Sequence, residues 1–131
     1  MRYLLMISAE ETEDDSTDPL TGTGLDSPDA TGELERRRAA GVAAFTAWLD
    51  DLTARGVLRA HEGLWPSRTA TTVRVREAQV LLTDGPYIEA KEQIGGFALI
   101  EVEDLDEAIE VAAGHPACAW GQVEVRPLRE L

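Results

Sequence analysis

The chain has 131 residues, the size of one ordinary domain, and 44% of them are hydrophobic, which is enough for a buried core. Its 25 acidic side chains outnumber 12 basic ones, giving a formal net charge of −13 at pH 7. Nucleic acids and anionic membranes require a basic surface, so this charge argues against both as partners. One cysteine excludes an internal disulfide framework. Without a signal-peptide-like or membrane-spanning apolar run, we expect a cytoplasmic protein.

The N-terminal part combines one strand with a long acidic segment. Residues 2–7 form a continuous apolar run without helical flanks, which predicts a buried central strand. From Ala9 to Gly32 the sequence is rich in Asp, Glu, Ser, Thr, Gly and Pro, a composition that cannot form a core. We predict a mobile loop over about residues 9–32, either a solvated insertion or a functional element.

The next segments predict a helix, a strand and a hairpin. Apolar residues recur at helical spacing between residues 32 and 55, and Gly56 can take the left-handed conformation that ends a helix. The expected apolar stripe consists of Leu34, Val42, Phe45, Trp48, Leu49 and Leu52. A short strand follows at residues 57–61. Residues 70–76 then alternate, and residues 79–83 form the partner strand, although the two residues between them make a poor turn.

The C-terminal part predicts a strand, a helix and a last strand. The first strand covers residues 96–102. Asp104 is placed as an N-cap, with Glu107 three residues later as in a capping box. Gly114 ends this helix and Pro116 prevents its resumption. The expected buried stripe consists of Leu105, Ala108, Ile109 and Ala112, and the last strand covers residues 122–126.

The order β-α-β, β-hairpin, β-α-β predicts an α+β fold of the ferredoxin-like type, a split βαβ sandwich with an inserted hairpin. Both helices should cover one face of the sheet. The central strands are apolar throughout, so the other face also needs a cover. A second copy of the sheet would supply it, and we therefore predict a homodimer packed sheet to sheet.

The segment from Thr83 to Tyr87 reads TDGPY, and residues 89–97 follow it as EAKEQIGGF. With these segments and their flanks, the chain resembles the DGPF family of the YCII-related group over nearly its whole length. The resemblance implies a ferredoxin-like fold that dimerises into an α/β-barrel-like assembly. It also implies a regulatory setting with a functional link to a sigma factor, because family members are often encoded beside such factors. Distant relatives include enzymes of aromatic degradation that use a His–Asp pair.

Asp84 is the central candidate residue, with two interpretations. Its carboxylate caps the Asp-Gly-Pro turn, or it lies at the mouth of a cleft as a general base or ligand anchor. Tyr87 can donate a phenolic hydrogen bond to a ligand or be a half-buried aromatic residue. Lys91, the only lysine, and Glu92 either belong to a solvated face or hold a ligand.

The two histidines lead to different expectations. His61, at the end of a predicted strand, is the second candidate for proton transfer. His115 follows a helix end, where the dipole favours a cation, so we expect it to be a cap. His115 and Cys118 alone are too few for a zinc site, and we predict no metal. No Gly-rich phosphate loop or nucleophile elbow is present, and we expect no cofactor.

Arg74 and Arg126 alternate with valines on their strands, and they either line a pocket or form a solvated face. The first functional hypothesis is a dimeric domain that binds a small ligand or a regulatory partner. The alternative is an enzyme of small aromatic or lactone-like metabolites, with Asp84 or His61 as the proton-transfer residue. A third is an interaction module whose acidic segment binds a basic protein surface.

Overall fold

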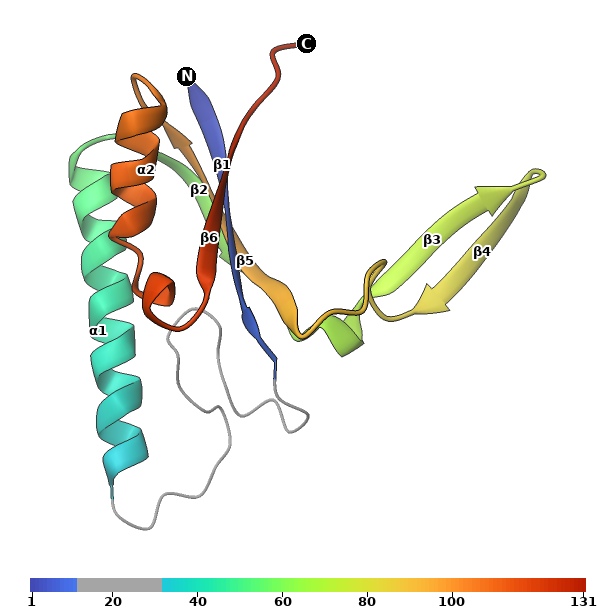
Figure 1. Ribbon diagram of the computed structural model, residues 1–131, viewed down its shortest axis with the longest axis horizontal. Coiled ribbons are helices and arrows are strands. Elements are labelled where there is room, and N and C mark those ends of the chain that lie inside the picture. Colours follow the sequence, from blue (N-terminus) through green and yellow to red (C-terminus); the bar gives the residue numbers. More distant parts are fainter. Residues whose placement is uncertain (12–31) are drawn as a thin grey trace.

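The computed structural model describes residues 1–11 and 32–131, which form an α+β fold (Figure 1). The elements in chain order are β1 (Arg2–Glu10), α1 (Glu33–Ala54), β2 (Leu58–Gly63), the 3-10 helix η1 (Ser67–Thr69), β3 (Thr71–Arg76), β4 (Gln79–Asp84), β5 (Glu92–Glu101), α2 (Leu105–Ala113), the 3-10 helix η2 (Pro116–Ala119) and β6 (Gln122–Pro127). The predicted acidic loop lies mostly outside the described residues. Its first two positions, Ala9 and Glu10, belong to β1 instead, because they pair with the start of β5.

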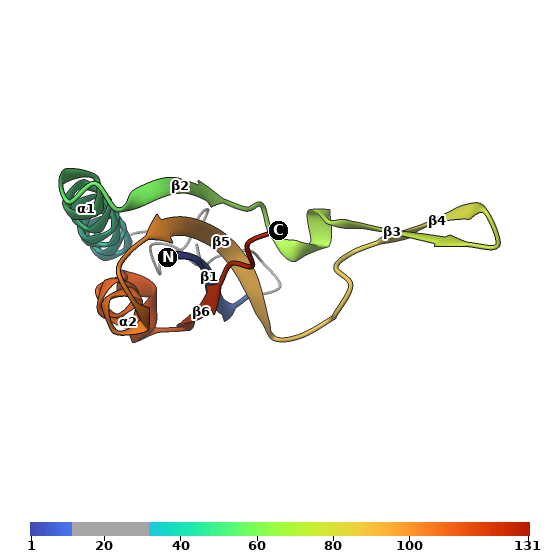
Figure 2. The ribbon, with the colours of Figure 1, turned by 90° about the horizontal axis from the view of Figure 1, so that it is seen from above.

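Four strands form an antiparallel sheet in the order β2-β5-β1-β6. Seen from above, α1 and α2 lie on one face of this sheet, as the sequence predicted (Figure 2). β5 begins at Glu92 rather than at the predicted residue 96, because residues 92–94 pair with the last three residues of β1. The structure therefore confirms the element order and the single helical layer, and it lengthens the two central strands.

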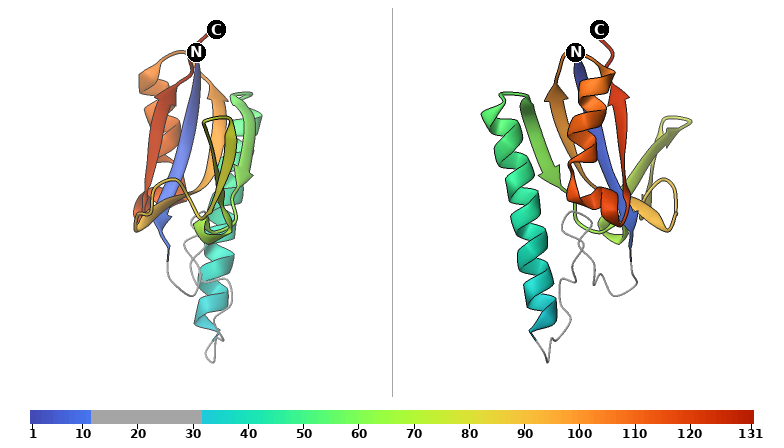
Figure 3. Two further views of the ribbon diagram at one scale, coloured as in Figure 1. Left: turned by 90° about the vertical axis from the view of Figure 1, so that its right-hand side faces the viewer. Right: turned by 60° about the vertical axis from the view of Figure 1, so that its left-hand side comes forward.

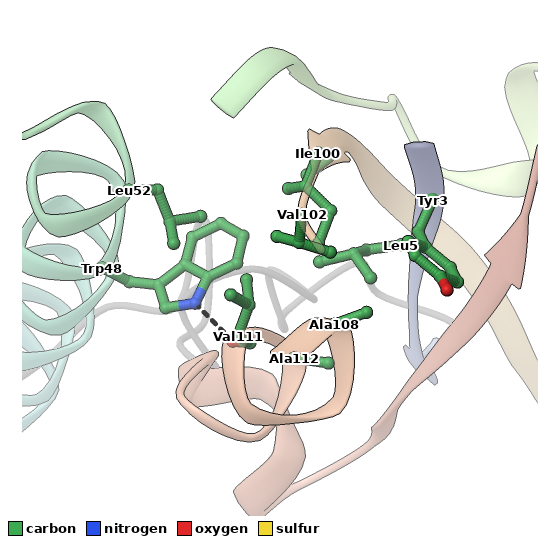
Figure 4. Close-up of a cluster of buried hydrophobic side chains, with 10 residues drawn as sticks. Tyr3, Leu5, Trp48, Leu52, Ile100, Val102, Ala108, Val111 and Ala112 are labelled. Carbon is green, nitrogen blue, oxygen red and sulfur yellow. Dashed lines mark hydrogen bonds between the residues drawn. The ribbon is translucent and has the colours of Figure 1, made fainter. Parts of the chain in front are cut away.

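The core lies between the helices and the sheet (Figure 4). Trp48 of α1 is buried there, and its indole Nε1 donates a hydrogen bond of 2.9 Å to the carbonyl oxygen of Val111 in α2. The predicted helix stripes need correction at their flanks. Val42 of α1 is exposed. The predicted Leu34 contact lies outside the described side chains. Leu105 and Ile109 are also exposed, because α2 turns its small Ala108 and Ala112 and its Val111 toward the sheet. These small residues allow close packing of the helix on the strands.

The other face of the sheet is uncovered by any described residue (Figure 3, left). Along its centre Leu4 lies opposite Leu99, and Met6 lies opposite Phe97. All four side chains are half-buried. Antiparallel strands that are buried on one side normally alternate apolar and polar residues, whereas these two central strands carry apolar residues on both faces.

The hairpin β3–β4 is a separate two-stranded sheet. It projects from the domain on the side opposite the helices (Figures 1 and 2). The connecting residues Glu77 and Ala78 have φ of 50° and 63°. Two successive left-handed residues form the turn that suits a two-residue hairpin, but Asn and Gly adopt it more easily than these residues. This agrees with the prediction of a turn with unfavourable residues.

No helix of the described residues combines the length and apolarity required to span a membrane.

Candidate functional site

A hollow of about 400 Å³ lies at the base of the hairpin, where the chain passes from β4 to β5. Its wall combines η1, the end of β4, the following loop and the start of β5. The lining residues are Ser67, Arg68, Asp84, Gly85, Pro86, Glu89, Ala90 and Gln93. The Asp-Gly-Pro motif singled out in the sequence thus forms one side of this hollow.

Backbone bonds hold the Asp-Gly-Pro turn. Gly85 has φ of +100°, a conformation that side chains strongly disfavour. Its N–H donates to the carbonyl oxygen of Ala70 at 2.7 Å, and its own carbonyl accepts from the hydroxyl of Thr72 at 2.8 Å. The turn is therefore closed by Ala70 and Thr72 rather than by the Asp84 carboxylate, which differs from the capping interpretation.

Glu11 fastens η1 to the rest of the site. Its carboxylate accepts from the backbone N–H of Ser67 at 2.8 Å and also from the Ser67 hydroxyl. The Glu11 N–H donates to the carbonyl of Lys91 at 3.0 Å. The Gln93 amide nitrogen in turn donates to the carbonyls of Ile88 and Ala90 at 3.0 and 3.1 Å. The walls of the hollow are thereby ordered by Glu11, which directly follows β1, and by Gln93 of β5.

Two residues that line the hollow carry carboxylates without a hydrogen-bond donor among the described residues. Within the described part of the chain, no group donates a hydrogen bond to the carboxylate of Asp84 or Glu89. The hydroxyl of Ser67 and the amide of Gln93 are already engaged within the walls. A carboxylate oxygen only accepts hydrogen bonds, so this side of the hollow is suited to groups that donate them.

His61 lies elsewhere. It stands opposite Ala98 in the main sheet, on the side that the helices cover. Its ring lies edge-on to Phe45 of α1, with 6.3 Å between the centroids. Since His61 does not line the hollow, a single chain does not bring it together with Asp84.

The sequence matches the YCII-related domain over residues 1–131. The chain belongs to the YCII-related domain family. A relative from Rhizobium meliloti (strain 1021), Uncharacterized protein R00369, is 40% identical over 67 residues, which are 50% of this chain and 54% of the relative. The chain thus spans about half the length of this curated relative. Among solved structures, 5-chloro-2-hydroxyhydroquinone dehydrochlorinase (TftG) from Burkholderia phenoliruptrix AC1100, in complex with 2,5-dihydroxybenzoquinone, is similar with a TM-score of 0.47 and 15% identity. The alignment covers 99% of this chain and 95% of that one.

The match confirms the resemblance to the YCII-related group. In this YCII-related domain, three predicted ligand-binding residues follow Asp84 closely in the sequence but do not line the hollow, namely Tyr87, Lys91 and Glu92. Tyr87 and Lys91 are exposed. The carboxylate of Glu92 accepts a hydrogen bond of 2.7 Å from the amide of Gln122.

The two predicted arginines are on separate elements. Arg74 lies on β3 opposite Leu81, and Arg126 lies on β6, where it forms an exposed ion pair of 2.7 Å with Glu124. Neither of these arginines lines the hollow, whereas Ser67 and Arg68 do. Sequence reasoning missed both, because the short η1 helix between two strands carries no periodicity that would mark it.

His115 is the clearest correction. The prediction made it a cap at the end of the preceding helix, favoured there as a cation, but the side chain is only 2% exposed and packs against the rings of Phe45 and Trp48. Burial lowers the pKa of His115 to about 4, so the imidazole is neutral at pH 7. Its Nδ1 accepts a hydrogen bond of 2.9 Å from the N–H of Ala117 and thus caps η2.

Among the described residues, no group of three or more His, Cys, Asp or Glu side chains lies close enough to hold a metal ion. Cys118 is exposed, and its Sγ lies 3.3 Å from the carbonyl oxygen of Ala112.

Proposed function

We propose that this YCII-related domain binds a small polar molecule in the hollow at the hairpin base and acts as a homodimer. The observation that carries the ligand proposal is the position of Asp84. Asp84 lines the hollow, and its carboxylate accepts no hydrogen bond from the described residues. A carboxylate without a structural duty in a preformed hollow is a suitable ligand anchor.

The chemistry of the walls defines the class of ligand. Asp84 and Glu89 offer acceptors only, so the ligand supplies several hydrogen-bond donors. Small amines and polyhydroxylated compounds meet this requirement.

The dimer proposal is supported by the uncovered apolar face of the sheet. Leu4, Met6, Phe97 and Leu99 would be buried by a second copy of the same face. The order β2-β5-β1-β6, with two helices on one face, is that of two split βαβ units. We therefore include in the proposal a ferredoxin-like fold that assembles as a dimeric α/β barrel.

The enzymatic alternative has less support. Proton transfer in aromatic or lactone-like metabolites would use Asp84 or His61, but within one chain these residues lie on different sheets and line no common hollow. A regulatory protein partner, including one linked to a sigma factor, stays a proposal that follows from the family resemblance.

The test combines native mass spectrometry with a thermal-shift screen of small amines and polyols. We expect a dimer and a molecule, either retained or found in the screen, that binds one site per chain. Asp84→Asn should weaken its binding roughly 10- to 100-fold, because a charge-assisted hydrogen bond contributes about 1.5–3 kcal/mol.

The matched control is Asp50→Asn, the same change of charge at an exposed position of α1. It should bind as the original chain does. If the Asp84→Asn variant binds the molecule as tightly as the original chain, the hollow is not the ligand site. A monomer in the mass spectrum would refute the dimer.

A further inference from the structure

The hairpin β3–β4, called the arm below, has little support from the rest of the described chain. Its two six-residue strands pair with each other and with no strand of the main sheet. An isolated two-stranded hairpin is marginally stable in water. The left-handed residues Glu77 and Ala78 weaken it further, since neither residue favours that conformation. The arm therefore requires a stabilising contact beyond its own two strands.

The arm has one apolar face. Val73 lies opposite Leu82 and Val75 lies opposite Val80, so these four side chains share a face. Between 57% and 68% of each is exposed. The opposite face includes polar residues such as Arg74. This division is typical of a strand pair that packs on an apolar surface with one side and contacts water with the other.

The arm and the uncovered sheet face are on the same side of the molecule. The arm projects away from the helices, and with the uncovered face toward the viewer it stands in front of the sheet (Figures 2 and 3, left). A molecule that covered the sheet face would thus lie alongside the arm. One partner can therefore bury both apolar surfaces.

We propose that the apolar face of the arm packs against the body of a second copy of this chain, whose own arm returns the contact. This inference rests on the dimer of the proposed function and adds a specific contact to it. In a two-fold symmetric dimer each copy presents the same surfaces, so the two arms are used equivalently and no apolar arm stays exposed.

The size of the interface favours this occupant. The uncovered sheet face presents about fifteen side chains, since alternate residues of its four strands point to it. A stable protein–protein interface uses roughly 20–30 residues from each partner. The apolar side of the arm, which is half of two six-residue strands, adds about six and brings the surface to the lower end of this range. The arm therefore enlarges an interface that the sheet face alone would leave below the usual size.

The experiment compares two neighbouring leucines of the full-length chain. Leu82→Thr changes the apolar face of the arm, and Leu81→Thr makes the same substitution on its opposite face. The dimer dissociation constant is measured by sedimentation velocity over a dilution series, with circular dichroism to verify the fold. We expect Leu82→Thr to raise the dissociation constant about thirtyfold, because each dimer loses two leucine contacts. Leu81→Thr should change it by less than about threefold, since Leu81 shares the opposite face of the arm with Arg74 and does not reach the proposed contact.

A third variant, Met6→Lys, tests the sheet face separately. If Met6→Lys dissociates the dimer while the Leu82 and Leu81 variants behave alike, the arm inference is wrong and the sheet-to-sheet dimer stands. A wild-type chain that stays monomeric at 100 µM overturns both. A Leu82→Thr variant that unfolds more easily but keeps its dissociation constant shows an arm that packs on its own chain, which also overturns the inference.

Discussion

Acidification should destabilise this domain through His115, and the effect can be isolated by replacing that residue with Asn. The folded protein holds the imidazole neutral, with a pKa of about 4, whereas the unfolded chain has the ordinary value of 6.5. Above pH 6.5 both states are neutral at this position and the free energy of unfolding does not change with its titration. As the pH falls below 6.5, the imidazole binds a proton in the unfolded state but not in the folded state. The free energy of unfolding therefore decreases until about pH 4.

The size of the effect follows from the difference between the two pKa values. A difference of about 2.5 units corresponds to about 3 kcal/mol when the titration is complete, and to about 2 kcal/mol at pH 5. Carboxylates in general contribute to the acid dependence of protein stability, and the chain has 25 of them, so the slope of the wild-type chain alone does not isolate His115. The difference between the chain and its His115→Asn variant does, because the carboxylates are common to both.

Urea unfolding at pH 7.5, 6.5, 5.5 and 5.0, at one fixed protein concentration, provides the measurement. The Asn side chain can still accept the hydrogen bond from Ala117, and its fixed cost of packing appears equally at every pH. We expect the stability of the variant to fall by about 2 kcal/mol less than that of the wild type between pH 7.5 and 5.0. His61→Asn, which removes the exposed histidine, is the matched control and should follow the wild type. Parallel curves for wild type and His115→Asn would refute the argument from burial.

Two further predictions concern stability at neutral pH. Asp104→Ala should cost about 1 kcal/mol in urea unfolding, because its carboxylate caps α2 with a 2.9 Å hydrogen bond, whereas Asp106→Ala in the first turn should cost less than half of that; equal costs would contradict the capping role. Gly121→Ala should cost about 3 kcal/mol, because the new Cβ would lie 2.1 Å from the Ser8 carbonyl oxygen. Gly114→Ala, whose Cβ meets only ordinary contacts of 3.4 Å or more, should cost about 1 kcal/mol or less, and a similar loss at both glycines would contradict the packing argument.

The features that sequence predicted best are those decided within a few residues. The Asp104 carboxylate bonds the N–H of Glu107, three positions away, as the capping pattern requires. Gly56 has φ of +71° at the end of α1, as expected for a helix stop. Such interactions form between neighbours along the chain, so their spacing is visible in the sequence before any tertiary contact is known.

The environment of His115 could not be predicted in this way. The rings that enclose it belong to Phe45 and Trp48 on α1, about seventy positions earlier in the chain. The local sequence, a histidine between Gly114 and Pro116, is equally compatible with an exposed cap. Only the packing of α1 beside the end of α2 decides that the ring is buried and uncharged.

The candidate site also combines a part that the local sequence indicates with a part that only tertiary contacts bring together. The Asp-Gly-Pro motif directed attention to Asp84, and the hollow is indeed at that turn. The opposite wall, with Ser67 and Arg68, is brought there by Glu11, whose bonds to Ser67 join positions 56 residues apart. No spacing rule links these positions, so the sequence identified one wall of the site and left the other unassigned.

The proposed ligand site and the proposed arm contact share one segment of chain. Asp84 ends β4 of the arm, and the chain that follows contributes Gly85, Pro86, Glu89 and Ala90 to the hollow before it enters β5 of the uncovered sheet. A ligand bound there would contact the connection that sets the direction of the arm relative to the sheet. If the arm reaches a second copy, the ligand can bind the dimer and the monomer with different dissociation constants. Binding equilibria are coupled reciprocally, so the ligand must then change the dissociation constant of the dimer by the corresponding factor. The two proposals, which are tested by separate variants, thus predict one reciprocal coupling between occupancy of the hollow and assembly of the dimer.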